Sequence, residues 1–409
     1  MLLKVRYNNS VFIKIFFTIF LFFYITGQLF PLDDFAIVRS SLMLGIVSIG
    51  LSRPIYQNFR QIPSLVNVGF LILFLWSVIC IMRGMLSDYS PRHVIGDAYK
   101  LILMPLLFYF FYSNISSKDN FYSILLFLSK LLIACGSVLI FLYSIGALEE
   151  LRFNFLYSYI PFIYLLIKGN KNRSNIPIIA FTFLLCLVPL TKGIGSLVAL
   201  LVFVIVLVLM SRYKIRFFVS LGLLSGVLSM ILTSYIVYFD PRVLQKVLIL
   251  FSDEADVLYV LEFIMAGRLT EIASVIFGNN LILGNGFGAN LTPILLHESL
   301  FPWYQGLLIS NSHSMHSVFG ELTLRTGLLS FFLVFLFYIF LAKRSYDWKN
   351  QEGKIIFAIS IMLIQEMIVG QSLSDAFIAP MFFLVYVLKF GSRKRSQSMT
   401  DNNQLKSSS

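Results

Sequence analysis

Long apolar segments recur along the chain and constrain its fold more than any other feature of the sequence. A helix needs about 20 apolar residues to cross a hydrocarbon core of about 30 Å. Composition agrees with such a fold, because 58% of the 409 residues are hydrophobic and only 13% are charged, whereas soluble chains are about half apolar and about a quarter charged. We therefore predict an all-α polytopic membrane protein with about twelve transmembrane helices. The predicted spans are residues 11–30, 35–51, 64–82, 93–113, 121–145, 155–167, 176–190, 193–211, 217–238, 318–342, 355–372 and 376–391.

The distribution of Lys and Arg predicts the orientation of these spans. With the N-terminus in the cytoplasm, 19 of the 32 basic residues lie in cytoplasmic segments, 7 lie in outer segments and 6 lie inside spans. Cytoplasmic loops of membrane proteins carry this excess of basic residues. Both termini are therefore predicted to be cytoplasmic, and the net charge of +12 is attributed to this bias rather than to a nucleic-acid partner.

The predicted topology divides the chain into four parts. Residues 1–238 hold nine transmembrane helices, 239–317 form a large periplasmic loop, 318–391 hold three further helices, and 392–409 form a basic cytoplasmic tail. The loop is unusual because its 79 residues far exceed a typical connection. Apolar residues recur in its first half at spacings of three and four, which favours amphipathic helices on the outer face.

Three outer cations are candidates for binding an anion. Arg152 and Lys192 lie in short outer loops and so oppose the charge bias, while Arg268 lies in the large loop. The arginine fork matches phosphate oxygens, and lysine offers a point charge. The alternatives are contact with lipid head groups and a loop salt bridge to Glu149 or Glu150.

His316 is a candidate for proton transfer, since histidine titrates near neutral pH and can orient or deprotonate a sugar hydroxyl. His313 lies three residues earlier and would share a helical face with it. The alternative is an interfacial histidine that faces water or head groups.

Gly284, Gly286 and Gly288 alternate in the sequence GNGFG, which is not a dinucleotide-binding fingerprint. They predict either a flexible turn or a backbone that a ligand approaches closely, which only glycine permits.

Charged residues inside the predicted spans occur at helical spacing. Glu321 precedes Arg325 by four residues and Asp97 precedes Lys100 by three, so each pair is predicted to form an ion pair on its own helix. The acidic residues at 253, 254 and 256 are interpreted as a solvated helix face, because no metal-ligand spacing accompanies them. We expect no metal and no other cofactor.

Motifs in the order of this topology resemble the bacterial O-antigen ligase and O-antigen polymerase superfamily. The large outer loop precedes the tenth span and contains AGRLTEIASVIFGNNLILGNGFGAN, which resembles an Arg-Leu helix of the family followed by a glycine-rich turn. The segment HSVFGELTLRTGLL has His316, Ser317, nine residues and Gly327, similar to the ligase pattern of histidine, a small polar residue, nine residues and glycine. The segment LTKGIGSLVALL occupies the place of a Thr-x-Ser-Arg-Gly-like turn.

The resemblance implies a GT-C-like, metal-independent glycosyltransferase in the bacterial inner membrane. Its donor would be an undecaprenyl-diphosphate-linked oligosaccharide, with a chain-length regulator and a flippase as protein partners. By this likeness Arg268 would hold the diphosphate and His316 would face the acceptor hydroxyl. Lys192 stands where the family usually has arginine, and Arg152 matches an outer-loop arginine more loosely. The general base stays open, with Glu298, Asp253 and His313 as alternatives.

The resemblance leaves three functions open. The leading hypothesis is a polymerase of lipid-linked repeat units, and the second is a ligase that transfers the finished glycan to lipid A–core. Ser317, in place of the more common asparagine, favours the polymerase slightly. The third is a transporter or flippase of lipid-linked sugars. Inverted repeats or paired broken helices would be the expected signs of it, and the sequence indicates neither.

Overall fold

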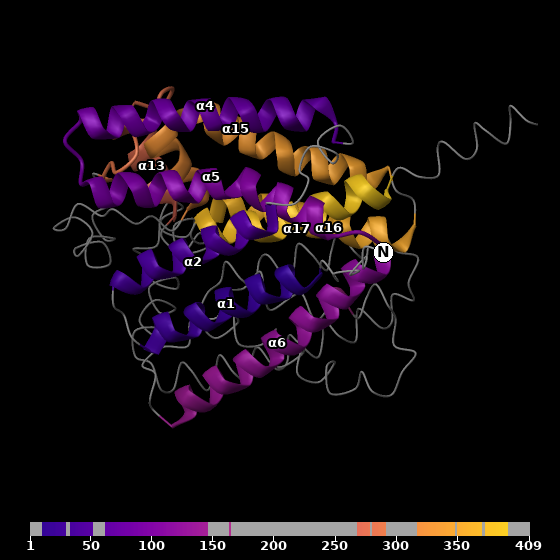
Figure 1. The fold of residues 1–409 in the computed structure, drawn as a ribbon. Helices are drawn as coiled ribbons and strands as arrows, with labels where there is room; N and C mark the ends of the chain where they lie inside the picture. The colour runs from indigo at the N-terminus through magenta and orange to yellow at the C-terminus, as the bar shows by residue number, and fades with distance from the viewer. Residues whose placement is uncertain are drawn as a thin grey trace, which may run out of the picture.

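The computed structural model of the protein describes nine helices and no strand within residues 10–29, 33–51, 62–145, 163–164, 268–278, 280–291, 317–347, 350–369 and 373–391. Figure 1 colours the helices by their order in the chain, from indigo at the N-terminus to yellow at the C-terminus. They are α1 (Ser10–Leu29), α2 (Asp33–Leu51), α4 (Ser64–Leu86), α5 (Pro91–Asn114), α6 (Lys118–Ser144), α13 (Arg268–Gly278), α15 (Val318–Tyr346), α16 (Gln351–Val369) and α17 (Leu373–Phe390).

Each predicted span that falls on described residues coincides with one helix, and the observed ends differ from the predicted ends by four residues or fewer. Among the described helices, four are long and apolar enough to cross a membrane: α4, α5, α15 and residues Lys118–Leu139 of α6. The described part is therefore compatible with a helical membrane protein. The predicted spans at 155–167, 176–190, 193–211 and 217–238, most of the large loop and the basic tail lie outside the described residues, apart from the helical pair 163–164.

Helices α5 and α15 organise the packing of the others. Helix α5 contacts α4, α2, α1 and α17, while α15 contacts α4, α13, α16 and α17. In Figure 1, α4, α15 and α5 lie side by side, and α1, α2 and α6 lie on the other side of α5. Because α4 ends where α5 and α15 begin, α4 runs antiparallel to both of its neighbours.

Aromatic rings fill the core between these helices. Phe70 of α4 stacks on Phe337 of α15 with ring centroids 4.5 Å apart. Phe111 of α5 meets Phe382 of α17 edge to face at 5.4 Å. Offset and edge-to-face pairs of this kind add to the stabilisation from burial alone. Contacts between aromatic rings therefore help to hold these helices together.

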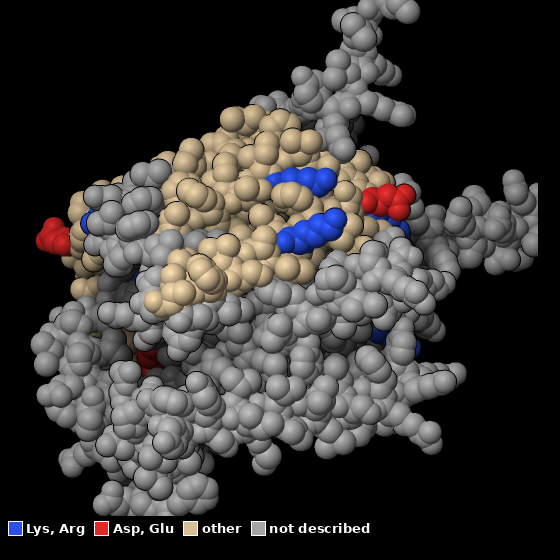
Figure 2. Space-filling model, turned by 90° about the horizontal axis from the view of Figure 1, so that it is seen from below, with Lys and Arg blue, Asp and Glu red and all other residues tan. Residues whose placement is uncertain are grey.

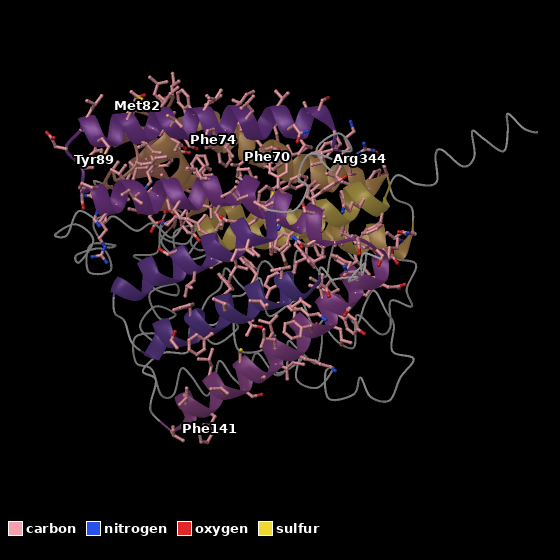
Figure 3. The ribbon with its side chains drawn as sticks, viewed as in Figure 1. Phe70, Phe74, Met82, Tyr89, Phe141 and Arg344 are labelled. Atoms are coloured by element: carbon pink, nitrogen blue, oxygen red, sulfur yellow. The ribbon has the colours of Figure 1, made fainter. Side chains whose placement is uncertain are left out.

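Apolar side chains also cover much of the described surface. Helix α4 exposes 59% of Met82 and 46% of Phe74, and α6 exposes 62% of Phe141; all three are labelled in Figure 3. Figure 2 shows the molecule from below, where few charged residues lie on the surface of the described part. Such a large exposed apolar area is unusual for a soluble monomer and suits contact with lipid.

The two ends of this helix group differ in chemistry. At one end α4 finishes and α5 and α15 begin, with Tyr89 in the α4–α5 turn (Figure 3). At the opposite end, where α15 finishes and α16 begins, Glu352 of α16 accepts hydrogen bonds from the Tyr122 and Tyr386 hydroxyls at 2.5 and 2.9 Å. Lys118 lies 3.0 Å from the same carboxylate. We call Glu352, Tyr122, Tyr386 and Lys118 the tyrosine cluster.

Candidate functional site

A short segment of the large loop inserts at the end of the group where α4 finishes. Residues 280–291, which we call the glycine loop, contact the last turns of α4 and the first turns of α5 and α15. In Figure 1 this loop lies beside α13 at the same end as the α4–α5 turn. We call this end the glycine-loop end.

All three glycines named from the sequence have positive φ, at 69° for Gly284, 96° for Gly286 and 85° for Gly288. Side-chain-bearing residues rarely adopt this conformation. A Cβ at Gly284 would lie 2.5 Å from the backbone nitrogen of Gly327, and one at Gly286 would lie 2.8 Å from that of Gly84. The glycines thus allow a close approach. Backbone atoms of α15 approach Gly284, and backbone atoms of α4 approach Gly286; Tyr89 of the α4–α5 turn and Val94 of α5 approach Gly288.

Helix α15 is broken opposite this loop. Gly327 has φ 75° and ψ 178°, so the chain leaves the helical path for one residue. The span predicted over 318–342 was a continuous helix, without this break. A break frees carbonyls that an unbroken helix would pair with N–H groups four residues later, and freed groups within a membrane need other partners.

The glycine loop and α4 supply those partners. Three carbonyls of α15 that directly precede Gly327 accept hydrogen bonds from outside their own helix, and one N–H of α15 donates to the loop. The bonds are Asn285 N to Leu324 O at 2.7 Å, Gly286 N to Arg325 O at 2.9 Å, Trp76 Nε1 to Thr326 O at 2.8 Å and Leu328 N to Leu281 O at 3.0 Å. The loop and α4 therefore supply hydrogen-bond partners at the break in α15.

Helix α4 binds the loop from the other side. The guanidinium of Arg83 donates to the carbonyl oxygens of Leu283 and Gly284, and the N–H of Phe287 donates to the carbonyl of Cys80 at 3.2 Å. An arginine so engaged is positioned by two carbonyls in a fixed geometry. These contacts join a segment of the large loop to a helix about two hundred residues earlier in the chain.

Four charged residues lie directly beneath the loop, and we call Asp97, Lys100, Glu321 and Arg325 the charge cluster. The ion pair between Glu321 and Arg325 on α15 is present, and Lys100 Nζ lies 3.8 Å from Asp97 Oδ1 on α5. Both pairings predicted from helical spacing are confirmed. Two further pairs cross between the helices: Arg325 Nη1 to Asp97 Oδ1 at 2.8 Å and Lys100 Nζ to Glu321 Oε1 at 2.6 Å.

The charge cluster is neutral as a set and deeply buried. The side chains of Asp97, Glu321 and Arg325 are each 2% exposed, and only Lys100 reaches 26%. Gly288 N donates to Asp97 Oδ2 at 2.9 Å, so the glycine loop is bound to the cluster as well as to the helices. Buried charges are tolerated when each is paired and hydrogen-bonded, and the cluster meets that condition by joining α5 to α15.

Helix α13, which lies within the predicted large loop, contacts the start of α15. Glu271 is buried, and its Oε2 accepts a hydrogen bond from the N–H of Ser317 at 3.2 Å. Val275 of α13 packs in a small apolar cluster with Ala289, Leu291 and Leu324. Glu271 was not among the residues singled out from the sequence. The available signal was an acid one helical turn after Arg268, and it did not reveal what the acid would contact.

The structure describes some of the predicted site residues and not others. Gly284, Gly286 and Gly288 are described as above, and Arg268 is the first residue of α13, although its side chain lies outside the described residues. Arg152, Lys192, His313 and His316 also lie outside them, so their roles remain predictions. Within the described part of the chain, no three His, Cys, Asp or Glu residues are grouped so as to hold a metal ion.

The sequence matches no family model and no curated protein. The fold defines the class as a helical protein compatible with membrane insertion. The features that bear on a more specific function are the glycine-loop end and the motifs of the predicted large loop.

Proposed function

We propose that the protein is a glycosyltransferase that polymerises lipid-linked oligosaccharide repeat units in the bacterial inner membrane. In this proposal the chain has twelve spans, cytoplasmic termini, a GT-C-like fold and a periplasmic loop over 239–317. The acceptor sugar hydroxyl of one lipid-linked unit attacks the anomeric carbon of another. A carbon–oxygen bond forms there, the bond to the diphosphate oxygen breaks, the hydroxyl proton passes to a base, and undecaprenyl diphosphate leaves.

The observation that carries the proposal is the hydrogen bond between Glu271 and Ser317. It connects α13, which begins at Arg268, to the residue that directly follows His316. The two residues to which the family resemblance gives roles therefore belong to segments that are in contact. A diphosphate leaving group needs cations where negative charge develops, and a fixed cation stabilises that charge without reorganising at the moment of reaction.

The position of this contact also supports a lipid-linked substrate. The glycine-loop end lies at the ends of helices that are apolar enough to cross a membrane, so a polar head group and an apolar tail can be accommodated together. Ionisable residues within membrane spans are functional candidates by default. The charge cluster is such a set, and its hydrogen bond to Gly288 joins it to the glycine loop.

One structural feature favours a second candidate, a transporter of lipid-linked sugars. Broken helices are typical of transporter binding sites, where they occur in pairs at corresponding positions. The break at Gly327 supplies one such helix. The ligase remains the closest alternative within glycosyl transfer, since it shares the motifs.

Reconstitution separates transfer from transport. The purified protein would be placed in liposomes that contain lipid-linked repeat units, and the products would be separated by length. We expect ladders of two or more joined repeats. Lipid-linked sugar that crosses the bilayer without any new glycosidic bond would refute the enzyme.

Substitutions test the residues assigned by resemblance. Arg268→Ala and His316→Ala are expected to abolish chain extension while the protein still inserts. Lys192→Arg should retain activity because arginine keeps the positive charge, whereas Lys192→Ala removes the charge and should abolish activity. Arg344→Ala is the matched control, because it removes an exposed cation at the opposite end of α15 (Figure 3). Wild-type polymer from any of the alanine variants at 268, 316 or 192 would remove that residue from the site.

A gene deletion separates polymerase from ligase. Loss of a polymerase leaves lipopolysaccharide capped by a single repeat. Loss of a ligase leaves full-length glycan on its lipid carrier and a bare core.

A further inference from the structure

Glu271 is a buried carboxylate whose contact lies at the start of a broken helix. It is 4% exposed, and the residue that it contacts, Ser317, is fully buried. Glu271 accepts a hydrogen bond from the N–H of Ser317 at 3.2 Å. This N–H belongs to the peptide group that joins residue 316 to residue 317. Glu271 therefore fixes the backbone immediately after His316, rather than a side chain at the surface.

The local structure of Ser317 explains why a carboxylate suits this position. Ser317 is the N-cap of α15, with φ −95° and ψ 123°, and its Oγ accepts a hydrogen bond from Gly320 N at 3.2 Å. The N-terminal N–H groups of a helix have no partner within the helix and carry a partial positive charge. The serine hydroxyl satisfies one of these donors, and Glu271 satisfies the N–H that precedes them.

The helix that carries Glu271 is itself held in place. Val275, one turn later on α13, packs against Leu324 of α15 and against Ala289 and Leu291 of the glycine loop. The bond from Glu271 therefore joins two packed elements, and a change in it alters the position of α15 relative to α13. Arg268 occupies the first position of α13, one turn before Glu271.

We propose that Glu271 is a positioning residue, which holds the peptide group after His316 so that the start of α15 is fixed against the helix that begins at Arg268. The inference rests on the proposed glycosyl transfer and assigns Glu271 no proton to give or take. What it needs is an acceptor oxygen at this position. Small misplacements of reacting groups reduce rates by about a hundredfold, which is the scale on which such a residue acts.

Two substitutions of Glu271 distinguish positioning from direct chemistry. Glu271→Gln keeps a carbonyl oxygen that can accept from Ser317 N–H, so its transfer rate should stay within about threefold of wild type, as expected when no transition-state interaction is lost. Glu271→Ala removes the acceptor, so kcat should fall about 10- to 100-fold with KM for the lipid-linked acceptor nearly unchanged.

Hydrogen exchange of the first turn of α15 gives a readout that does not depend on activity. In detergent-solubilised full-length protein, the amides of residues 317–320 should exchange faster in Glu271→Ala than in wild type, and at the wild-type rate in Glu271→Gln. Glu352→Ala is the matched control, since it removes a hydrogen-bonded carboxylate from the tyrosine cluster. It should lower the thermal unfolding temperature and leave kcat and the exchange of 317–320 unchanged.

Each result decides the question. Loss of transfer in Glu271→Gln equal to that in Glu271→Ala would mean that charge or a proton is required, which overturns positioning. Wild-type kcat and wild-type exchange in Glu271→Ala would overturn it as well. If wild-type protein transfers no sugar, the proposed function fails, and the exchange rates of the two variants still decide whether Glu271 anchors α15.

Discussion

The glycine-loop end and the tyrosine cluster join the same group of helices by opposite means. The tyrosine cluster uses side chains alone: two hydroxyls and one partly exposed lysine surround the carboxylate of Glu352. Burial would raise the pKa of Glu352, but hydrogen bonds from Tyr122, Lys118 and Tyr386 outweigh it and lower the pKa. The glycine-loop end uses backbone groups, a helix break, three buried charges and the partly exposed Lys100.

The difference shows where the chain departs from the geometry that would be most stable locally. Nothing at the tyrosine cluster requires an unusual backbone, whereas the glycine-loop end combines positive φ at four glycines with ionised groups that are almost fully buried. Proteins violate local rules mainly at functional sites and compensate elsewhere. The contrast therefore supports placing the function at the glycine-loop end.

Removing one member of the charge cluster should have the largest effect on stability. Arg325→Met leaves Asp97 and Glu321 with Lys100 as the nearest remaining cation of the cluster. Breaking a buried pair by removing one partner costs about 3 to 5 kcal/mol. Reversible unfolding in mixed micelles measures the loss. Arg325→Lys, which keeps the charge, should recover part of it, and an Arg325→Met variant as stable as wild type would refute a structural role for the cluster.

Substituting the glycine at the helix break should have the next largest effect. A Cβ at Gly327 would collide with the carbonyl oxygen of Ile282. The alanine backbone would also have to adopt φ 75°. Strain and overpacking together predict a loss of roughly 2 to 4 kcal/mol for Gly327→Ala in the same unfolding assay.

Gly96→Ala is the control for this substitution. Gly96 lies within α5, and a Cβ there meets nothing within 4 Å. Alanine is a better helix former than glycine by about 1 kcal/mol, so Gly96→Ala should be neutral or stabilising. Equal losses from the two variants would show that the break at Gly327 is not a special position.

Removing a single hydrogen bond at the break should lower the free energy of unfolding by less than Gly327→Ala does. Trp76→Phe removes the indole N–H that donates to the Thr326 carbonyl at 2.8 Å and keeps most of the aromatic volume. Leaving a buried acceptor unsatisfied costs about 1 to 3 kcal/mol, so the unfolding free energy should fall within that range. Tyr109→Phe, which removes a hydroxyl bond between α5 and Asn67 of α4, is the control and should cost less than Trp76→Phe.

The smallest effect is expected at the tyrosine cluster. Lys118 is 41% exposed, so Lys118→Met removes an ion pair that solvent already screens. Exposed pairs contribute about 0 to 1 kcal/mol, and the two tyrosine hydroxyls still hydrogen-bond Glu352. A loss from Lys118→Met as large as that from Arg325→Met would remove the contrast between the two ends.

The sequence predicted the helices well because hydropathy and length are local properties. The spans predicted at 64–82 and 318–342 became α4 and α15 with ends shifted by four residues or fewer. The break at Gly327 was not predicted, since a glycine within an apolar run gives no sign of its φ. Its conformation depends on the glycine loop, whose contact with α15 is a tertiary one.

Only part of the candidate site could be predicted. Spacing of three and four residues identified each pair within its own helix, Asp97 with Lys100 and Glu321 with Arg325. It could not show that both pairs join one cluster, because local spacing says nothing about which helices face each other. Glu271 was missed for the same reason, since its partner is a backbone N–H that is 46 residues away in the chain.

Arg83 and Trp76 are synthesised long before the carbonyls to which they donate, since 200 residues separate Arg83 from Leu283 and 250 separate Trp76 from Thr326. During biogenesis the hairpin of α4 and α5 therefore enters the bilayer with donors that only later segments can satisfy. Until those segments are made, the donors need water or other polar groups as partners. A chain that ends before residue 280 would lack the acceptors of both side chains.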